Sequence, residues 1–206
     1  MASIWKAITG TFEQNTMKIK LSNTLLDCLH TGDVKYVHRD MQEWFHKPSG
    51  QEHYRLLMHL AFCYDGVQIA DIGTYRGASA VALAQNPRNN VFSLDVGVFK
   101  EEIKMDNLEF LVGDFKTDKS IQERILKCPL IFLDIDHMYH NEIWFYNFLK
   151  ENNWKGTMFC DDIFLCDEMK RFWEEVSHPK IDITQYGHFS GTGVILFDSD
   201  TTIELT

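Results

Sequence analysis

Two acidic motifs in the second half of the chain carry the residue types best suited to chemistry. Asp134-Ile135-Asp136-His137 closes the predicted strand 130–135, and Asp161-Asp162 follows the predicted strand 157–160. Parallel strands end at the same edge of a sheet, so both motifs are expected at one site. Four carboxylates gathered there would repel one another unless a cation neutralised them. Oxygen ligands with room for water predict Mg²⁺, or Mn²⁺ in its place.

The same residues have a second interpretation as helix caps. Asp136 or His137 could cap a helix beginning at Tyr139, and Asp162 could cap the segment that follows it. Capping accounts for one residue at each strand end but not for two at both, which favours the metal interpretation. His188, in the loop 186–192, could reach the same edge, whereas the lone histidines His59 and His140 are assigned no role.

A glycine turn, Asp71-Ile72-Gly73-Thr74-Tyr75-Arg76-Gly77, follows the predicted strand 67–70. Its glycines let the backbone approach a ligand closely, and the helix after it offers free N–H groups. The third glycine of the G-x-G-x-x-G pattern is missing, so a pyrophosphate cradle is poorly formed and NAD is disfavoured.

Two more acidic residues end the next strands. Asp95 lies 24 residues after Asp71, at a position where a carboxylate can bind both hydroxyls of a ribose, and Asp114 could meet an adenine edge. Each could instead be a turn or N-cap residue. Together, at three neighbouring strand ends, they favour a nucleoside that carries a positive charge and no phosphate.

The elements that must position these residues alternate between strands and helices. Strands are predicted over 67–70, 91–94, 108–112, 130–135 and 157–160, and helices over 78–84, 119–127, 139–151 and 167–176. Two-sidedly apolar strands alternating with helices predict a parallel sheet covered on both faces. The last strands, 181–186 and 193–197, have no helix between them and predict an antiparallel edge.

The first part of the chain lacks this alternation of strands and helices. Residues 1–48 are interpreted as an N-terminal helical appendage or lid, with short helices over 18–29 and 34–45, and residues 49–206 as the main domain. Ser49-Gly50-Gln51-Glu52 matches a capping box. The apolar residues after it have helical spacing and predict an amphipathic helix as far as Tyr64.

The composition of the chain limits the classes of protein and partner that are possible. The chain has 206 residues and a net charge of −10, which disfavours nucleic acid and anionic membranes as partners. No apolar stretch is long enough to span a bilayer, no signal peptide is recognised, and the five cysteines form no C-x-x-C pair. We therefore expect a cytoplasmic protein with reduced thiols; the sequence leaves a homo-oligomer open.

Taken together, Asp71-x-Gly73-x-x-x-Gly77, Asp95, Asp134-x-Asp136-His137 and Asp161-Asp162 make residues 49–198 resemble class I S-adenosylmethionine-dependent methyltransferases. The resemblance is to the metal-dependent sugar O-methyltransferases, such as macrocin O-methyltransferase. It implies an α/β Rossmann-like methyltransferase fold with a seven-stranded mixed sheet, order 3-2-1-4-5-7-6, whose last strand is antiparallel.

The resemblance also implies roles for residues. Asp71, Gly73 and Gly77 would shape the pocket for the methionine end of S-adenosylmethionine, Asp95 would hold the ribose, and Asp114 would lie by adenine. Thr74, Tyr75, Ser79 and Asp134 are further cofactor-binding residues. Asp134, Asp161 and Asp162 would hold the metal. His137 is the first candidate for the catalytic base and Asp136 its rival.

The acceptor implied is a sugar hydroxyl, on a deoxyhexose such as rhamnose in a glycan or glycoside. His137 stands where catechol-type relatives have lysine, which disfavours catechol and caffeoyl substrates. The short chain is also similar to methyltransferases of large algal viruses that act on capsid glycans, which would place it in a host cytoplasm. The alternatives are a D-x-D phosphatase with Asp134 as nucleophile, a D-x-D glycosyltransferase, a catechol-type O-methyltransferase and a non-catalytic binding module.

Overall fold

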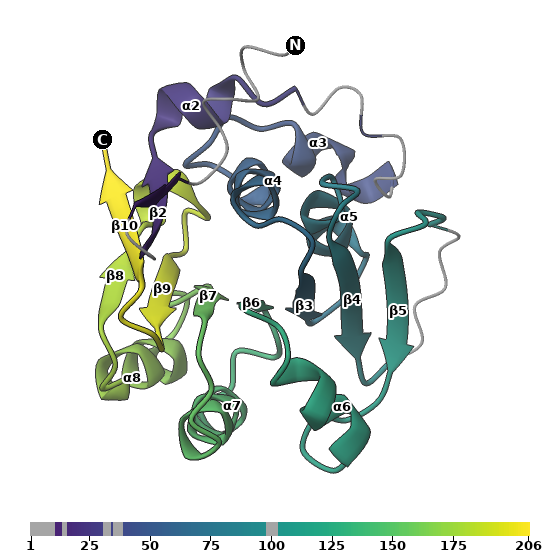
Figure 1. Cartoon of the computed structure of the whole chain (residues 1–206), viewed down its shortest axis with the longest axis vertical. Coiled ribbons are helices and arrows are strands. Elements are labelled where there is room, and N and C mark those ends of the chain that lie inside the picture. Colours follow the sequence, from purple (N-terminus) through teal and green to yellow (C-terminus); the bar gives the residue numbers. More distant parts are fainter. Residues whose placement is uncertain (1–10, 14–15, 31–33, 35–38, 98–102) are drawn as a thin grey trace.

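A central sheet of seven strands organises the computed structural model, which describes residues 11–13, 16–30, 34, 39–97 and 103–206 (Figure 1). The strand order is β5-β4-β3-β6-β7-β9-β8, and β9 runs antiparallel to both of its neighbours while the remaining pairs are parallel. Numbered along the sheet, this is the predicted order 3-2-1-4-5-7-6. The strands are β3 (Gln68–Ile72), β4 (Asn90–Asp95), β5 (Leu108–Val112), β6 (Leu130–Leu133), β7 (Thr157–Asp161), β8 (Lys180–Asp182) and β9 (Thr192–Leu196).

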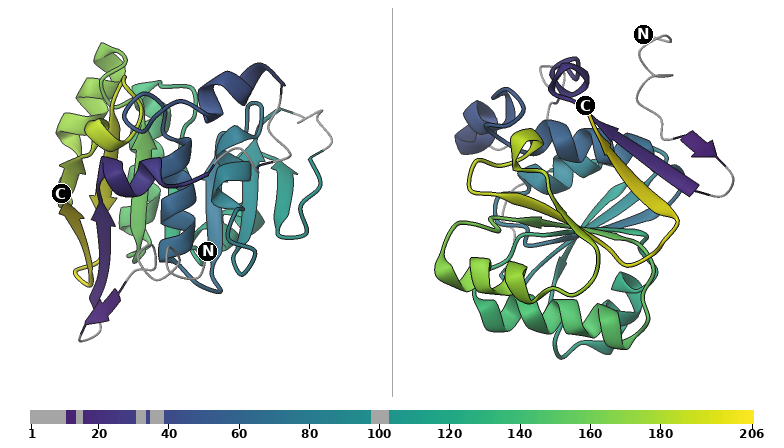
Figure 2. Two further views of the ribbon diagram at one scale, coloured as in Figure 1. Left: turned by 90° about the horizontal axis from the view of Figure 1, so that it is seen from above. Right: turned by 90° about the vertical axis from the view of Figure 1, so that its left-hand side faces the viewer.

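Helices cover both faces of this sheet (Figure 2). One face carries α4 (Tyr54–Cys63) and α5 (Ala78–Leu83), and the other carries α6 (Lys119–Ile125), α7 (Tyr139–Glu151) and α8 (Asp167–Glu175). All four residues of β6 are buried: Phe132 belongs to the apolar core under α4 and α5, and Ile131 and Leu133 to the core over α7. The central strands are therefore apolar on both faces because both faces are covered.

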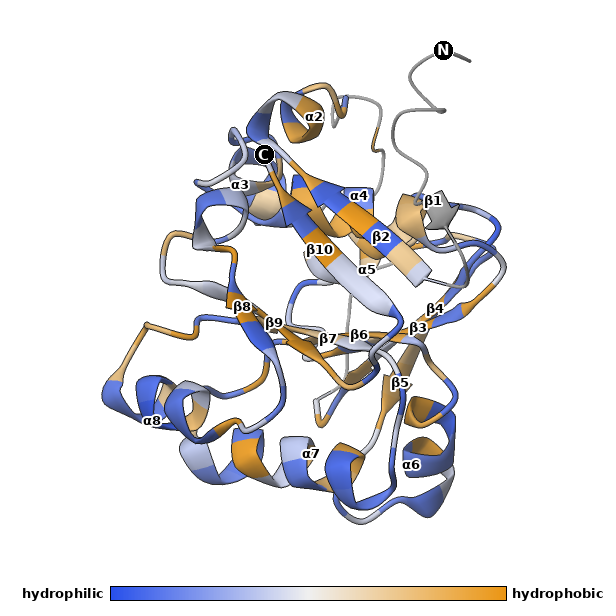
Figure 3. Ribbon diagram, turned by 60° about the vertical axis from the view of Figure 1, so that its left-hand side comes forward, coloured by the Kyte–Doolittle hydropathy of each residue, from blue (hydrophilic) through white to orange (hydrophobic). Residues whose placement is uncertain are grey.

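A second, smaller sheet departs from the predictions for residues 1–48 (Figure 3). In it β2 (Thr16–Leu21) pairs in parallel with β10 (Thr201–Leu205) and antiparallel with β1 (Thr11–Glu13). The helix predicted over 18–29 is wrong for residues 18–21; α2 (Asn23–Asp27) occupies only its later part. Met17, Ile19 and Leu21 alternate into the core under α4, which is the periodicity of a half-buried strand. The N-terminal segment is thus not wholly helical.

The predicted helix over 34–45 is reduced to two short turns. They are the 3-10 helix η2 (Arg39–Met41) and α3 (Gln42–Phe45), and residues 35–38 lie outside the described part of the chain. The predicted strand 181–186 is likewise shorter, because β8 gives way to the 3-10 helix η3 (Thr184–Tyr186). All five cysteines are free thiols. Among the described residues, no helix is both long enough and apolar enough to cross a bilayer.

The capping box predicted at residues 49–52 does not form. Helix α4 begins at Tyr54, after a His53 N-cap that makes no side-chain capping bond. The Ser49 hydroxyl instead donates to Asp27 Oδ1 at 2.9 Å. Glu52 is buried, with 5% of its surface exposed, and its side chain faces the sheet edge described next. Tertiary contacts outweigh the local capping motif here.

Candidate functional site

The glycine turn lies at the carboxyl end of β3, against the neighbouring strands. Gly73 donates its N–H to Leu94 O at 2.8 Å and has a left-handed φ of +108°. A Cβ at this position would lie 1.6 Å from the carbonyl oxygen of Asp134. Gly77, with φ +75°, is the N-cap of α5. Only glycine at position 73 lets the turn pack directly on the segment that follows β6.

Asp95 joins this turn to the end of β4. Its Oδ2 accepts hydrogen bonds from the backbone N–H groups of Thr74 and Tyr75, both at 3.1 Å, and its Oδ1 accepts one from Gly97 at 2.9 Å. The carboxylate therefore fixes the shape of the turn. Its position at the rim also leaves it facing the cavity beside the turn.

That cavity, of about 470 Å³, opens along the carboxyl ends of β3, β4, β5 and β6. Gly73, Tyr75, Asp95, Asp114 and Asp134 line it, all of them residues predicted from the sequence. Its size falls in the range of small-molecule sites. Lys116 and Asn141, which the sequence analysis did not single out, also line the cavity, and the Lys116 ammonium donates to the Asn141 side chain.

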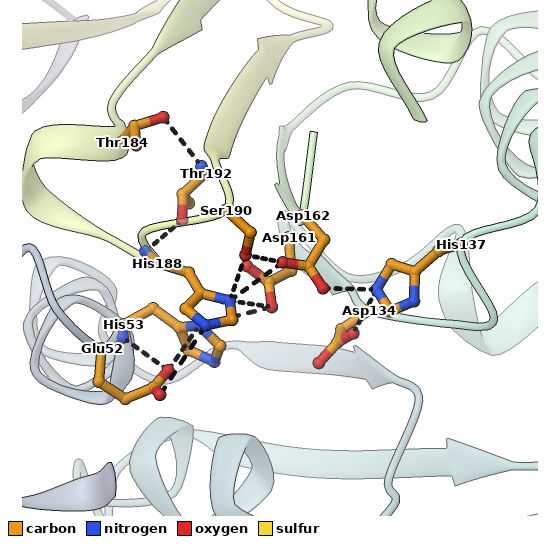
Figure 4. A network of polar contacts seen from close by, with 10 residues as sticks. All are labelled: Glu52, His53, Asp134, His137, Asp161, Asp162, Thr184, His188, Ser190 and Thr192. Atoms are coloured by element: carbon orange, nitrogen blue, oxygen red, sulfur yellow. Dashed lines mark hydrogen bonds and ion pairs between the residues drawn. The ribbon is translucent and has the colours of Figure 1, made fainter. Parts of the chain in front are cut away.

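A cluster of carboxylates and imidazoles adjoins the cavity at Asp134 (Figure 4). Asp134 follows β6, Asp161 ends β7, and Asp162 comes directly after it. His137 Nε2 lies 3.3 Å from Asp134 Oδ1 and 3.1 Å from Asp162 Oδ2. The structure therefore brings together both acidic motifs, as predicted, with His137 between them.

Two residues of the cluster have left-handed backbones. His137 has φ +58° and Asp162 has φ +56°, a conformation that non-glycine residues adopt uncommonly. The segment after Asp162 is tied to the loop after η3, because Ile163 and Phe164 donate to Gly191 O and Ser190 O at 3.1 and 2.9 Å. Ser190 Oγ in turn donates to Asp162 Oδ1. These bonds hold the conformation that turns Asp162 inward.

Charge in the cluster is balanced between carboxylates and imidazoles. Contacts with Asp134 and Asp162 raise the pKa of His137 to about 10. Burial raises the pKa of Asp162, but close contacts with the imidazoles of His137 and His188 and a hydrogen bond from Ser190 outweigh burial and hold that pKa well below its usual range. Burial raises the pKa of Asp161 above that of an exposed aspartate. A cluster of this kind is suited to binding a cation that can replace the imidazolium charges.

Comparison with known proteins rests on structure alone, since no family model and no curated protein matches the sequence. A candidate caffeoyl-CoA O-methyltransferase from Staphylococcus aureus superposes with a TM-score of 0.50 at 12% identity, over 80% of this chain and 86% of that one. The chain has the fold of S-adenosylmethionine-dependent methyltransferases.

Two further structures are similar at lower scores. A candidate S-adenosylmethionine-dependent methyltransferase from Streptococcus mutans gives a TM-score of 0.49 at 12% identity over 69% of this chain, which spans 47% of that protein's length. MycE methyltransferase of the mycinamycin pathway, solved with Mg and S-adenosylhomocysteine, gives 0.41 at 14% identity, over 74% of this chain and 51% of that one.

Within this methyltransferase fold, three of the predicted cofactor residues are buried below the turn. Asp71 is fully buried, and its Oδ2 accepts a hydrogen bond from Ser93 Oγ at 2.5 Å. Thr74 Oγ1 lies 2.7 Å from the same hydroxyl, and a hydrogen bond from Ser79 also reaches Asp71. Asp71, Thr74 and Ser79 thus support the turn from beneath, while the other predicted residues line the cavity or shape its loop.

Asp136 occupies a different environment from the other motif carboxylates. Its Oδ1 accepts a hydrogen bond from Met138 N at 3.3 Å, and its Oδ2 accepts one from Asn141 Nδ2 at 2.5 Å. These bonds stabilise the turn before α7, but they do not cap the helix, because its N-cap is Met138 and no side chain caps it. The capping interpretation is therefore wrong for Asp136, which also lines the cavity. Asp114 is similar: it lines the cavity and accepts from Lys116 N at 2.8 Å.

Sequence reasoning also missed Glu52, His53 and Glu142, which lie at or beside the carboxylate–histidine cluster. Glu52 and His53 come from the turn before α4, and their side chains reach Asp161 and His188. Glu142, on α7, is 1% exposed, and its Oε2 has no hydrogen-bond partner among the described residues. Burial raises the pKa of Glu142 to about 8. Glu142 could have been found from the sequence, because it is a glutamate on the apolar face of a predicted helix.

The carboxylate oxygens and imidazole nitrogens of the cluster are suitable ligands for a divalent cation. Asp134 and Asp161, with His53, each place one ligand atom within 4.8 Å of the others, and so do Asp161, Asp162 and His188. Asp161 is 3% exposed, and its Oδ1 has no hydrogen-bond partner among the described residues. A buried carboxylate oxygen without a partner is costly unless a cation binds it.

Proposed function

We propose that the chain is an S-adenosylmethionine-dependent O-methyltransferase that acts on a sugar hydroxyl. The observation that carries the proposal is that Asp134 belongs both to the wall of the 470 Å³ cavity and to the carboxylate–histidine cluster. A methyl donor in the cavity and an acceptor at the cluster would thus meet at one residue. Bringing both substrates into contact is the main requirement for transfer between them.

On the donor side, residues of the glycine turn and β4 would bind S-adenosylmethionine, whose sulfonium supplies an electrophilic methyl group. Asp95 would accept hydrogen bonds from the ribose, since its carboxylate lines the cavity. Asp114 and Lys116 lie on the wall next to β5, where they would meet the adenine edge. The buried Asp71 would keep the turn in shape through Ser93 and Thr74.

On the acceptor side, Asp134, Asp161 and Asp162 would hold the cation, Mg²⁺ or Mn²⁺. Such an ion lowers the pKa of a sugar hydroxyl and fixes its orientation. During transfer the carbon–sulfur bond breaks as the carbon–oxygen bond forms, and the hydroxyl proton passes to a base of the protein. His137, which contacts both Asp134 and Asp162, is the proposed base. The two carboxylates raise its pKa to about 10, so the ring can accept a proton only once the bound cation has taken over the charge of the imidazolium and left the ring neutral. Asp136 remains its rival because it also lines the cavity.

The apolar residues around the cluster favour an aromatic, catechol-type acceptor as the second candidate. Met138, Phe164, Leu165 and Phe189 are all exposed and follow the cluster residues closely in sequence. The segment Ile163–Phe164 is hydrogen-bonded to the loop that carries Phe189. Aromatic side chains at the mouth would stack on a catechol ring as well as on the apolar face of a deoxyhexose.

The first experiment is a calorimetric titration of the protein with S-adenosylhomocysteine, in Mg²⁺ and again in EDTA. We expect micromolar binding in both, because the cavity and the carboxylate cluster are adjacent but separate. Absence of binding in both conditions would overturn the proposal. Assays with rhamnosides and with a catechol then distinguish the two acceptors. Phosphate release and nucleotide-sugar hydrolysis test the D-x-D alternatives.

The variant Asp162→Asn tests whether the cofactor cavity and the carboxylate–histidine cluster are separate sites. Asp162 is in the carboxylate cluster and is not a wall residue of the cavity, so methyl transfer should be lost while the affinity for S-adenosylhomocysteine stays within about twofold. Equal loss of both would contradict two adjoining sites. In parallel, His137→Ala and Asp136→Asn are compared by pH–rate profile, and the variant that keeps the wild-type profile does not remove the base.

A further inference from the structure

The buried imidazole of His53 is the feature that the proposed function leaves unexplained. His53 is 3% exposed, and neither of its ring nitrogens has a hydrogen-bond partner among the described residues. Its Nδ1 nevertheless lies 3.3 Å from Glu52 Oε1 and 3.5 Å from Asp161 Oδ2. Leaving a buried polar group unpaired is costly, so a ligand that binds the ring nitrogens would stabilise this arrangement.

A second imidazole, that of His188, lies next to the His53 ring. The rings of His53 and His188 are 5.3 Å apart between centroids and nearly perpendicular, at 79°. His188 Nε2 is 3.9 Å from Glu52 Oε2, and its Nδ1 is 3.3 Å from Asp161 Oδ2. Figure 4 shows both rings and the Glu52 carboxylate directed toward one another.

The spacing of these atoms is that of ligands around one ion. Glu52, His53 and His188 each place one ligand atom within 4.8 Å of the other two. Ligands about 2.0–2.2 Å from a tetrahedral metal ion are separated from one another by roughly 3.3–3.6 Å. Among the three residues, His53 Nδ1 and Glu52 Oε1 match that separation at 3.3 Å. His188 Nε2 and Glu52 Oε2, at 3.9 Å, are a few tenths of an ångström further apart and would move closer on an ion.

The ligands are also held in place by the fold. The His53 ring packs against Tyr54 and Phe132, with centroid distances of 4.7 and 5.3 Å. His188 donates its backbone N–H to Thr192 Oγ1 at 2.7 Å, and the turn that follows it closes through Gly191 N and His188 O at 3.0 Å. The site is therefore built from the turn before α4 and the loop before β9.

We propose that Glu52, His53 and His188 bind a first-row transition-metal ion, with Asp161 between this ion and the Asp134–Asp162 carboxylates. Imidazole nitrogen favours ions such as Co²⁺, Ni²⁺, Zn²⁺ or Fe²⁺, whereas Mg²⁺ and Mn²⁺ prefer oxygen ligands. The chain would then hold two cations of different chemical class on the two sides of Asp161. Glu52, His53 and His188 have no role in the proposed methyl transfer, which shares only Asp161 with this site. The second metal site therefore does not depend on methyl transfer.

The test is a titration of EDTA-treated, dialysed protein with CoCl₂ in saturating MgCl₂, followed by calorimetry and by visible absorption. We expect one equivalent of Co²⁺ to bind despite the Mg²⁺ and to give the d–d bands of a nitrogen-ligated ion. His53→Gln, His188→Gln and Glu52→Gln should each weaken Co²⁺ binding by about tenfold or more, since even outer partners of metal ligands cost that much.

His30→Gln is the matched control, because His30 is exposed and lies outside the cluster. It should leave both the affinity and the spectrum unchanged. Thermal melts confirm that each variant is folded; if His53→Gln does not fold, His188→Gln and Glu52→Gln decide the matter, because His188 and Glu52 lie on different segments. Each variant is also titrated with S-adenosylhomocysteine, so that failure of the metal site is distinguished from failure of the cofactor site.

Three outcomes would overturn the proposal. Saturating Mg²⁺ could abolish Co²⁺ binding, which would mean a single all-carboxylate site. The histidine variants could bind Co²⁺ as wild type does, which would remove the imidazoles as ligands. Finally, His30→Gln could reduce binding as much as His53→Gln, which would mean adventitious binding by surface histidines.

Discussion

At the scale of single residues, both the cavity and the carboxylate–histidine cluster depend on Gly73. Its turn packs on the carbonyl of Asp134, where a Cβ would approach to 1.6 Å. We expect Gly73→Ala to lower the free energy of unfolding by about 3–5 kcal/mol, because backbone must move and the left-handed φ is strained as well. Urea unfolding measures this loss.

Gly66 provides the control for Gly73. It also has a positive φ, +69° against +108° at Gly73, but a Cβ there meets nothing within 4 Å. Gly66→Ala should therefore show only the conformational penalty, about 1–2 kcal/mol. If the two variants lose equal stability, the contact with Asp134 has no role.

Asp71 makes stability depend on pH in a direction that can be worked out. Burial raises its pKa in the folded protein to about 7, above the ordinary value of 3.8, although hydrogen bonds from Ser93 and Ser79 act in the opposite direction. The folded protein then binds more protons than the unfolded chain between these values, so the unfolding free energy falls as pH rises through this window.

The measurement compares wild type with Asp71→Asn by urea unfolding from pH 4 to pH 8. The variant does not ionise, so the difference between the two should move in favour of the variant by up to about 4 kcal/mol as pH rises. Taking a difference removes the contributions of other groups with raised pKa values, such as Glu142. A difference that is flat across this range would show that Asp71 stays charged.

At the scale of elements, the sequence predicted the central sheet well because its signals are local. Strands β3 to β7 and helices α5 to α8 begin within one residue of their predicted starts, and the acidic motifs end strands as expected. Burial on both faces makes each strand a continuous apolar run, which a short window of sequence reveals.

The predictions that failed depend on distant contacts. The run Met17-Lys18-Ile19-Lys20-Leu21 alternates like a strand, but its partner β10 is about 185 residues away along the chain. Likewise Ser49 and Glu52 match a local capping box, whereas the fold uses Ser49 to bind Asp27 and Glu52 to line the cluster. The alternation over residues 17–21 is a local strand signal that the helix prediction overlooked. The partners of Ser49 and Glu52 lie outside any short window of sequence, so the capping motif alone gave a wrong cap.

The pairing of β2 with β10 implies that the N-terminal segment belongs to the core. Ile19 is fully buried in the core that also contains α4, while Lys20 on the same strand is exposed. Ile19→Ala should cost about 2–5 kcal/mol of unfolding free energy. Lys20→Ala should cost less than about 1 kcal/mol, since its contact with Glu204 is at the surface. Equal, small effects on chemical unfolding would mean that β2 is only loosely attached.

At the scale of the whole molecule, the sheet gathers ligands from segments far apart in sequence. Residues 52–53, 134–137, 161–162 and 188–190 all meet at one end of β6 and β7. The acidic motifs were predictable because they follow strands directly. The Glu52–His53 turn was not, because only the packing of α4 against the sheet brings it there.

The net charge of the molecule predicts which classes of acceptor it does not bind. Twenty basic against thirty acidic side chains give −10, and the cluster adds buried carboxylates at the site itself. Binding RNA requires Lys and Arg to neutralise phosphates, and each such contact makes affinity fall with salt. We therefore expect that adding the protein does not change the fluorescence anisotropy of a labelled single-stranded RNA at about 0.15 M salt, the physiological value.

Two results would contradict this prediction. Micromolar RNA binding whose logarithm of affinity falls linearly with the logarithm of salt concentration would contradict a small uncharged acceptor such as a sugar. Binding that is insensitive to salt would indicate contacts with the bases rather than the phosphates, and would equally count against the proposed acceptor.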